Sequence, residues 1–139
     1  MIIIKSENAK TALKFVEAIN SHSVKLISTL LTEKHKFIDG LGKSINGKEI
    51  ATEAWSKYLK VFPEYFIRID EVIEKDNIVL LIGQAKGKLS ESAAKTKSRQ
   101  FKVHAVWQAK VKNNLVAEWR IYGDNKPVYE LLAKNNIRL

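Results

Sequence analysis

The stretch VFPEYFIRIDEVIEK, residues 61–75, contains the point at which the spacing of apolar side chains changes. Upstream of it, from about Lys48, apolar residues recur at helical intervals, and Pro63 ends that helix because its ring cannot continue the helical backbone pattern. Downstream, residues 65–75 alternate between apolar and polar side chains, which is typical of a half-buried strand. The chain is therefore expected to place its helices before Pro63 and its main sheet after it.

Two more helices and a short strand are expected before Lys48. Ser6 can cap a first helix, whose apolar residues recur at intervals of three and four up to Ile19, and a second, short helix begins near Val24. The stretch HKFID, residues 35–39, has the pattern of a short strand, and the turn-rich connection GLGKSING follows it.

The C-terminal half predicts an antiparallel meander. Strands are expected over residues 78–89, 99–112 and 115–122, with a loop over 90–98 and a short final helix after the last strand. Helices followed by a meander indicate an α+β fold, in which helices pack on one face of a curved sheet. We find no internal repeat and no linker, so the whole chain, 1–139, is expected to form a single domain.

The composition excludes several classes of protein. The 139 residues include no cysteine, so disulfides and thiolate metal sites are absent, and no run approaches the roughly 20 apolar residues of a membrane span. The N-terminal MIIIK does not have the pattern of a signal peptide. We therefore expect a cytoplasmic protein without a membrane partner.

The formal net charge of +9 raises the question of an anionic partner. The lysines are spread along the chain, and the densest basic cluster falls in residues 88–102, at Lys88, Lys95, Lys97, Arg99 and Lys102. No nucleic-acid-binding motif accompanies this cluster. A solvated basic surface is the expectation, and a nucleic-acid partner is not expected.

Two short motifs connect this order of elements to a known family. The stretch FIDGLG followed by GKEI, and AEWRIYGDN on the last strand, resemble the NTF2-like superfamily, in particular its SnoaL-like and ketosteroid-isomerase-like branch. The resemblance implies a cone-shaped fold, in which a strongly bent, mostly antiparallel sheet wraps around N-terminal helices and leaves a pocket at the wide end. It also implies a homodimer formed through the outer face of the sheet.

Asp39 is the first candidate catalytic residue. In the resembled steroid isomerases an Asp-Pro-x-Gly stretch supplies the general base, and here the stretch is Asp39-Gly40-Leu41-Gly42, with Gly40 in place of the proline. A carboxylate in an apolar pocket could move a proton on and off carbon. The alternative is that Asp39 only opens the glycine turn through its side-chain oxygen.

His104 and Tyr58 are the candidate partners of Asp39. By resemblance, His104 lies where the isomerases hold a protonated aspartic acid, and a neutral imidazole N–H could donate the same hydrogen bond to an oxyanion. Tyr58 could donate a second. The alternative for His104 is a core or surface histidine, and its strand parity decides between them; we expect it to face the pocket.

The remaining candidates are ligand-binding residues that would form or border the pocket. They are His35, Trp55, Phe62, Trp107, Trp119, Tyr122 and Asp124. The alternatives are that the aromatic residues are plain core, that His35 only begins a strand, and that Asp124 caps the last helix. The three histidines have no metal-ligand spacing, so neither a metal nor a cofactor is expected.

The cyclases and epoxide hydrolases of the superfamily typically carry an acid just after the tryptophan of the last strand. This chain has Arg120 and Ile121 there, which weakens those assignments. We therefore expect a small-molecule pocket protein, with cofactor-free proton transfer of the isomerase or cyclase type on a hydrophobic carbonyl compound. The alternatives are a non-catalytic binding module for a hydrophobic small molecule and a dimeric interaction domain.

Overall fold

The computed structural model describes residues 6–97 and 99–138. Residues 1–5, considered above for a signal peptide, Ser98 at the end of the expected loop, and Leu139 lie outside the described residues. The elements follow the expected order, with one extra strand, β2, inside the turn-rich connection. They are α1 (Glu7–Asn20), α2 (Val24–Thr29), β1 (Leu31–Ile38), β2 (Ser44–Asn46), α3 (Lys48–Val61), β3 (Phe66–Lys75), β4 (Ile78–Lys88), β5 (Gln100–Lys112), β6 (Leu115–Gly123) and α4 (Lys126–Lys134).

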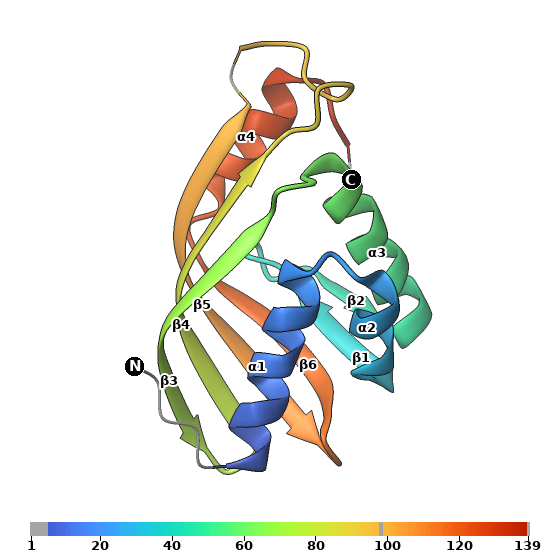
Figure 1. Ribbon diagram of the computed structural model, residues 1–139, viewed down its shortest axis with the longest axis vertical. Coiled ribbons are helices and arrows are strands. Elements are labelled where there is room, and N and C mark those ends of the chain that lie inside the picture. The colour runs from blue at the N-terminus through green and yellow to red at the C-terminus, as the bar shows by residue number, and fades with distance from the viewer. Residues whose placement is uncertain (1–5, 98, 139) are drawn as a thin grey trace.

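The six strands form one curved, unclosed sheet in the order β2-β1-β6-β5-β4-β3. Every neighbouring pair is antiparallel except β1 and β6, which run parallel, so the sheet is mixed. Figure 1 shows α1 crossing one face of the sheet, with α2 and α3 beside it and α4 near the opposite end. The expected α+β architecture, with helices on a mostly antiparallel curved sheet, is confirmed.

A bulge in β3 helps to bend the sheet. The pairing of β3 with β4 shifts between Ile69 and Glu71, so one extra residue of β3 is accommodated there. Gly83 lies opposite, paired with Ile69, and a Cβ at this position would overlap the backbone carbonyl of Arg68. Glycine is therefore required where the two backbones approach this closely.

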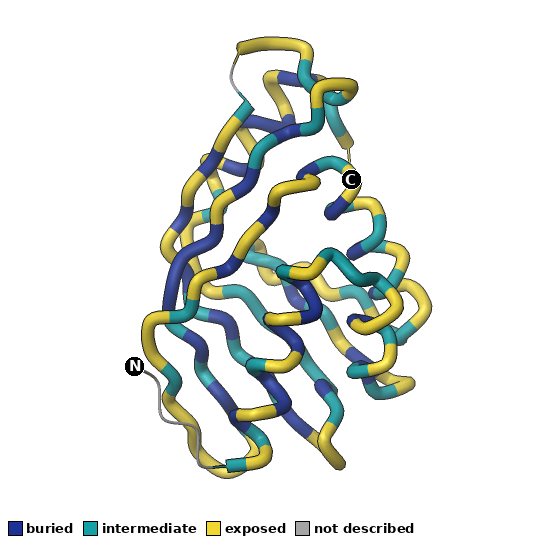
Figure 2. Tube along the Cα trace, viewed as in Figure 1, coloured by how far each residue is buried: buried dark blue, intermediate teal, exposed yellow. Residues whose placement is uncertain are grey.

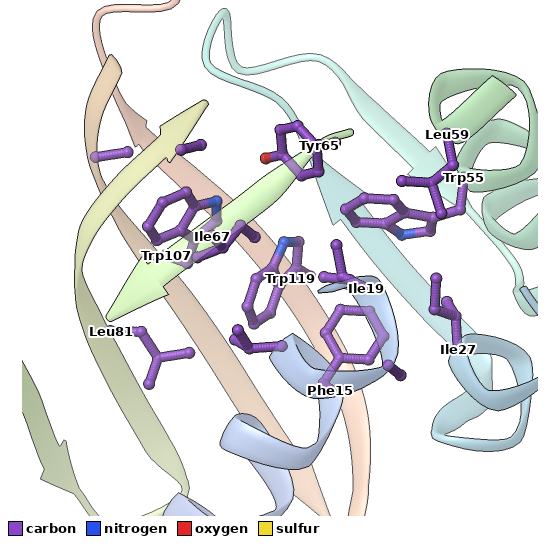
Figure 3. Packing of buried hydrophobic residues seen from close by; sticks show 14 of the residues in the cluster. Phe15, Ile19, Ile27, Trp55, Leu59, Tyr65, Ile67, Leu81, Trp107 and Trp119 are labelled. Atoms are coloured by element: carbon purple, nitrogen blue, oxygen red, sulfur yellow. The ribbon is translucent and has the colours of Figure 1, made fainter. Parts of the chain in front are cut away.

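The core lies between α1 and the concave face of the sheet. Phe15 of α1 is fully buried, and its ring centroid is 4.8 Å from that of Trp119 on β6. Figure 2 shows the buried residues of α1 facing the sheet, and Figure 3 shows Phe15, Ile19 and Trp119 packed together there. Burying rings of this size supplies much of the free energy that favours folding.

The opposite face of the sheet is partly exposed and carries an apolar row. Ile82 of β4 pairs with Val106 of β5, which in turn pairs with Tyr122 of β6, and Tyr122 is 44% exposed. This is the face that the expected homodimer would use, and the dimer stays a prediction. Within the described residues, no helix is both long and apolar enough to cross a membrane.

Asn20 ties the end of α1 to the first long strand. Its side-chain Nδ2 donates to the Ile67 carbonyl at 2.9 Å, and its Oδ1 accepts from the Ile67 N–H at 2.8 Å. The amide therefore replaces a neighbouring strand at this point of β3 and fixes where α1 meets the sheet.

We predict that Asn20→Ala lowers the free energy of unfolding by about 1–3 kcal/mol, because both Ile67 backbone groups lose their partner. Urea denaturation measures this change. Asn8→Ala, at the other end of α1, removes only an exposed bond to the Asp76 carbonyl and should change stability by less than about 0.5 kcal/mol. Equal losses in the two variants would contradict the assigned role of Asn20.

Candidate functional site

A cavity of about 430 Å³ opens between α3, α4 and the concave face of the sheet. Most of its lining is apolar, and much of it is aromatic. Trp55 and Tyr58 come from α3, Tyr65 precedes β3, and Phe101 and Trp107 come from β5. Small-molecule sites typically have this composition, with a few polar groups set in an apolar wall.

Tyr58 and Tyr65 are two of the polar residues that line the cavity. The rings of Tyr58 and Tyr65 pack edge to face, with their centroids 5.0 Å apart. Burial raises the pKa of the Tyr58 hydroxyl well above its usual range, and the neighbouring hydroxyls of Tyr65 and Tyr129 raise this pKa further. Burial likewise raises the pKa of Tyr65. Both hydroxyls therefore stay protonated at physiological pH and can donate a hydrogen bond.

Neither hydroxyl has a hydrogen-bond partner within residues 6–97 and 99–138. No described side chain or carbonyl accepts from Tyr58 or Tyr65, although both residues line the cavity. Since both residues line the cavity, these two donors are available to a bound molecule.

Asp39 lines the cavity and also organises the turn after β1. Its Oδ1 accepts from the Leu41 N–H at 2.9 Å and from the Lys43 N–H at 3.0 Å. These bonds are the turn-opening role that the sequence allowed as the alternative. Oδ2 has no hydrogen-bond partner among the described residues. A role in the turn and a role as general base are therefore geometrically compatible for Asp39.

Tyr129 of α4 stands close to Asp39 at the cavity. Burial raises the pKa of Tyr129, and the negative charge of Asp39 raises it further. Tyr129 is 38% exposed, which places it toward the opening of the cavity. The exposed Glu53 and Lys57, one turn apart on α3, also line the cavity.

The expectation that His104 faces the pocket is wrong. On β5 the buried residues Val103, Ala105 and Trp107 alternate with exposed or partly exposed ones, and His104 is exposed. It pairs with Gln84 of β4 on the outer face of the sheet. Asp39 and His104 therefore do not converge on one cavity, because successive side chains of a strand point to opposite faces.

His35 is a core residue that does not line the cavity. It is fully buried, and its Nδ1 lies 2.7 Å from the Val116 carbonyl, so Nδ1 carries the proton and donates. No described residue pairs with its Nε2. Burial lowers the pKa of His35, against smaller opposing effects of the Val116 carbonyl and Glu118.

The other expected lining residues divide between cavity, core and surface. Trp55 and Trp107 line the cavity, as expected. Phe62 and Trp119 are instead fully buried in the core. Tyr122 lies on the outer face, where the Arg120 guanidinium carbon is 4.7 Å from its ring centroid.

Asp124 belongs to the turn before α4 rather than to the cavity. Its Oδ1 accepts from the Lys126 N–H at 2.9 Å, which is the capping role allowed as its alternative. The next residue, Asn125, does line the cavity, although its side chain makes no capping bond to the helix.

Several lining residues did not appear among the sequence candidates. Phe101 and Val103 have the inward parity of β5, and Tyr65 has the parity of the inward residues of β3, which begins just after it; this alternation could have identified all three. Tyr129 and Leu132 come from α4, and no local pattern shows where a short terminal helix docks. Within the described residues, no cluster of three or more histidine, aspartate or glutamate side chains could hold a metal.

A family model described as a SnoaL-like domain matches residues 12–128. The chain belongs to the SnoaL-like family. No curated protein matches the sequence. Among solved structures, a proposed SnoaL-like polyketide cyclase from Shewanella putrefaciens CN-32 is 20% identical, with a TM-score of 0.79 over 94% of this chain and 99% of that one.

Two further solved structures share the fold of this SnoaL-like chain. An NTF2-like protein of unknown function from Cytophaga hutchinsonii ATCC 33406 is 16% identical, with a TM-score of 0.68 over 93% of this chain and 99% of that one. A protein with a ketosteroid isomerase-like fold from Catenulispora acidiphila DSM 44928, in complex with trimethylamine, is 13% identical, with a TM-score of 0.73 over 93% and 94%. Similarity at these sequence identities shows the fold only. The chemistry must be argued from the residues of the site.

We predict that His35 makes this protein less stable in mild acid. Because burial lowers its pKa below the usual value of 6.5, the unfolded chain binds a proton that the folded chain does not. The free energy of unfolding should therefore fall as the pH drops through about 6.5, and His35→Gln should flatten that fall. Urea denaturation across this range measures both slopes. His104→Gln, on the exposed face, is the control and should keep the wild-type slope.

Proposed function

We propose that this SnoaL-like protein binds a flat, largely apolar small molecule that carries a carbonyl or similar oxygen. The observation that carries the proposal is the pair of unpartnered hydroxyls, Tyr58 and Tyr65, in an aromatic cavity of about 430 Å³. The rings of Trp55, Phe101 and Trp107 offer flat apolar surfaces to such a compound.

The ligand oxygen would accept hydrogen bonds from the Tyr58 and Tyr65 hydroxyls. A phenol that remains protonated is a reliable donor, and a donor inside an apolar wall interacts more strongly than one in water. A compound without an acceptor oxygen would leave both hydroxyls unsatisfied, which costs binding free energy. The pair therefore favours oxygenated aromatic compounds over hydrocarbons of the same shape.

We predict that 9-fluorenone binds more tightly than fluorene, its counterpart without the carbonyl oxygen. Tyr58→Phe and Tyr65→Phe should each weaken fluorenone binding by about 5- to 10-fold and leave fluorene binding nearly unchanged, because each removes one donor. Quenching of tryptophan fluorescence on titration gives the dissociation constants.

Tyr122→Phe is the matched control, because this tyrosine lies on the outer face of the sheet. The variant should bind both compounds as the wild type does. If fluorenone and fluorene bind the wild type equally, the assignment of the two hydroxyls is wrong. If neither compound gives saturable quenching, cavity binding of such molecules is wrong.

A second candidate function is cofactor-free proton transfer on the bound carbonyl compound. It is favoured by Asp39, whose Oδ1 is anchored by two turn N–H groups while Oδ2 has no described partner beside the cavity. In this scheme Asp39 removes a proton from the carbon next to the carbonyl, and Tyr58 donates to the enolate oxygen that forms. The proposed polyketide cyclase among the structural relatives supports searching for chemistry on carbonyl compounds.

We predict that the protein accelerates exchange of the α-protons of β-tetralone with deuterated water, measured by proton NMR. Asp39→Asn should reduce this acceleration by about 100-fold or more, because the amide cannot accept the proton. The amide oxygen can still accept from the Leu41 and Lys43 N–H groups, so the turn should persist. Asp124→Asn, outside the cavity, is the control, and equal exchange rates in the wild type and Asp39→Asn would reject this function.

A further inference from the structure

A second hollow, of about 450 Å³, lies next to the cavity, between the turn after β1 and the first part of α4. Its lining includes Leu41, Asp124, Lys126 and Glu130, so charged side chains from α4 and from the turn before it border this hollow. The two hollows share Asn125 and Tyr129 as lining residues. Asn125 immediately precedes α4 and Tyr129 lies in its first turn, so these two side chains stand between the hollows.

The partition has a second half, contributed by the turn after β1. Asp39 lines the cavity, whereas Gly40 lines the second hollow, so the backbone passes between the two spaces. The halves meet at Gly40 and Asn125. A Cβ built on Gly40 would lie 2.5 Å from Asn125 Nδ2 and 3.4 Å from its Cγ, so the amide packs directly against the glycine.

The side chains of this wall are not held by hydrogen bonds within the described residues. The Asn125 side chain does not cap α4, and no described group pairs with its amide or with the Tyr129 hydroxyl. The opposite end of α4 is firmly anchored, because the fully buried Asn135 accepts from the Lys95 N–H at 2.6 Å and from the Thr96 N–H at 2.9 Å. The wall can therefore be altered without releasing the helix.

We propose that the wall formed by Gly40, Asn125 and Tyr129 limits the length of the ligand. The inference rests on the proposed binding of a flat apolar compound in the cavity. With the wall in place, a compound held by Tyr58 and Tyr65 cannot extend past Asn125 and Tyr129 into the second hollow. With the wall removed, the cavity joins the second hollow, and a longer substituent can extend past the turn toward Lys126 and Glu130.

Gly40 gives a way to open the wall without deleting a side chain. Its φ lies outside the left-handed region, so alanine is compatible with the backbone there. The atom that a new methyl group would meet is the end of the flexible Asn125 side chain, which can rotate away. Gly40→Ala should therefore displace the Asn125 amide at little cost to folding.

The test is a series of fluorenones that carry a straight alkyl ether chain from methyl to dodecyl, titrated by tryptophan fluorescence. In the wild type, affinity should fall by about tenfold or more once the chain is long enough to meet Asn125 and Tyr129, because a packed wall has no room for the added methylenes. Tyr129→Ala and Asn125→Ala should move this fall to longer chains, when the affinity of each compound is divided by that of unsubstituted fluorenone for the same variant. Gly40→Ala should also move the fall in affinity to longer chains.

A double variant tests the contact itself. If Gly40→Ala acts by displacing Asn125, it should have no further effect in the Asn125→Ala background. Tyr122→Ala, on the outer face of the sheet, is the control and should keep the wild-type length dependence. Urea denaturation of each variant confirms that binding is compared between folded proteins.

The outcomes separate this inference from the function on which it rests. If the wild type binds no member of the series, the proposed function is wrong and the wall has no ligand to limit. If the wild type binds fluorenone, but Tyr129→Ala and Asn125→Ala keep its length dependence, the proposed role of the wall is wrong. The proposal that the cavity binds such compounds would remain. If the wild type binds compounds of every chain length equally, the proposal that the wall limits ligand length is also wrong.

Discussion

The pairing register of β5 decides which side chains reach the interior of this protein. β5 lies between β4 and β6, and both pairings place Val103, Ala105 and Trp107 on the concave face. A slip by one residue would move Trp107 out and bring His104 in, because side chains alternate along a strand. The core, the cavity and the apolar row on the outer face all depend on this register.

The fold was predictable where local patterns are strong. The change of period at Pro63 separates the helices from the long strands, and the turns at residues 76–77 and 113–114 join neighbouring strands as hairpins. The short strand β2 was not predictable, because three residues carry no measurable periodicity. The parallel pairing of β1 with β6 was not predictable either, since it joins segments that no local pattern relates.

The site was predictable only in part, and the reason differs from residue to residue. Trp55 and Tyr58 share one face of a helix that the resemblance places beside the pocket, and they do line the cavity. Phe62 lies one turn further along that face and is core, because spacing gives the direction of a side chain but not its depth. His104 was misplaced because both faces of β5 carry apolar residues, Val106 on the outside among them, so alternation alone was ambiguous.

The parallel pairing of β1 with β6 constrains the order in which the chain can fold during synthesis. His35 on β1 and Val116 on β6 are joined by a hydrogen bond although they are 81 residues apart in the sequence. Closing a span of this length is slower than forming a hairpin between adjacent strands. Phe15 and Trp55 leave the ribosome long before Trp119, against which Phe15 packs. These aromatic rings therefore lack their native packing partner until β6 has been synthesised, and non-native contacts must be avoided until then.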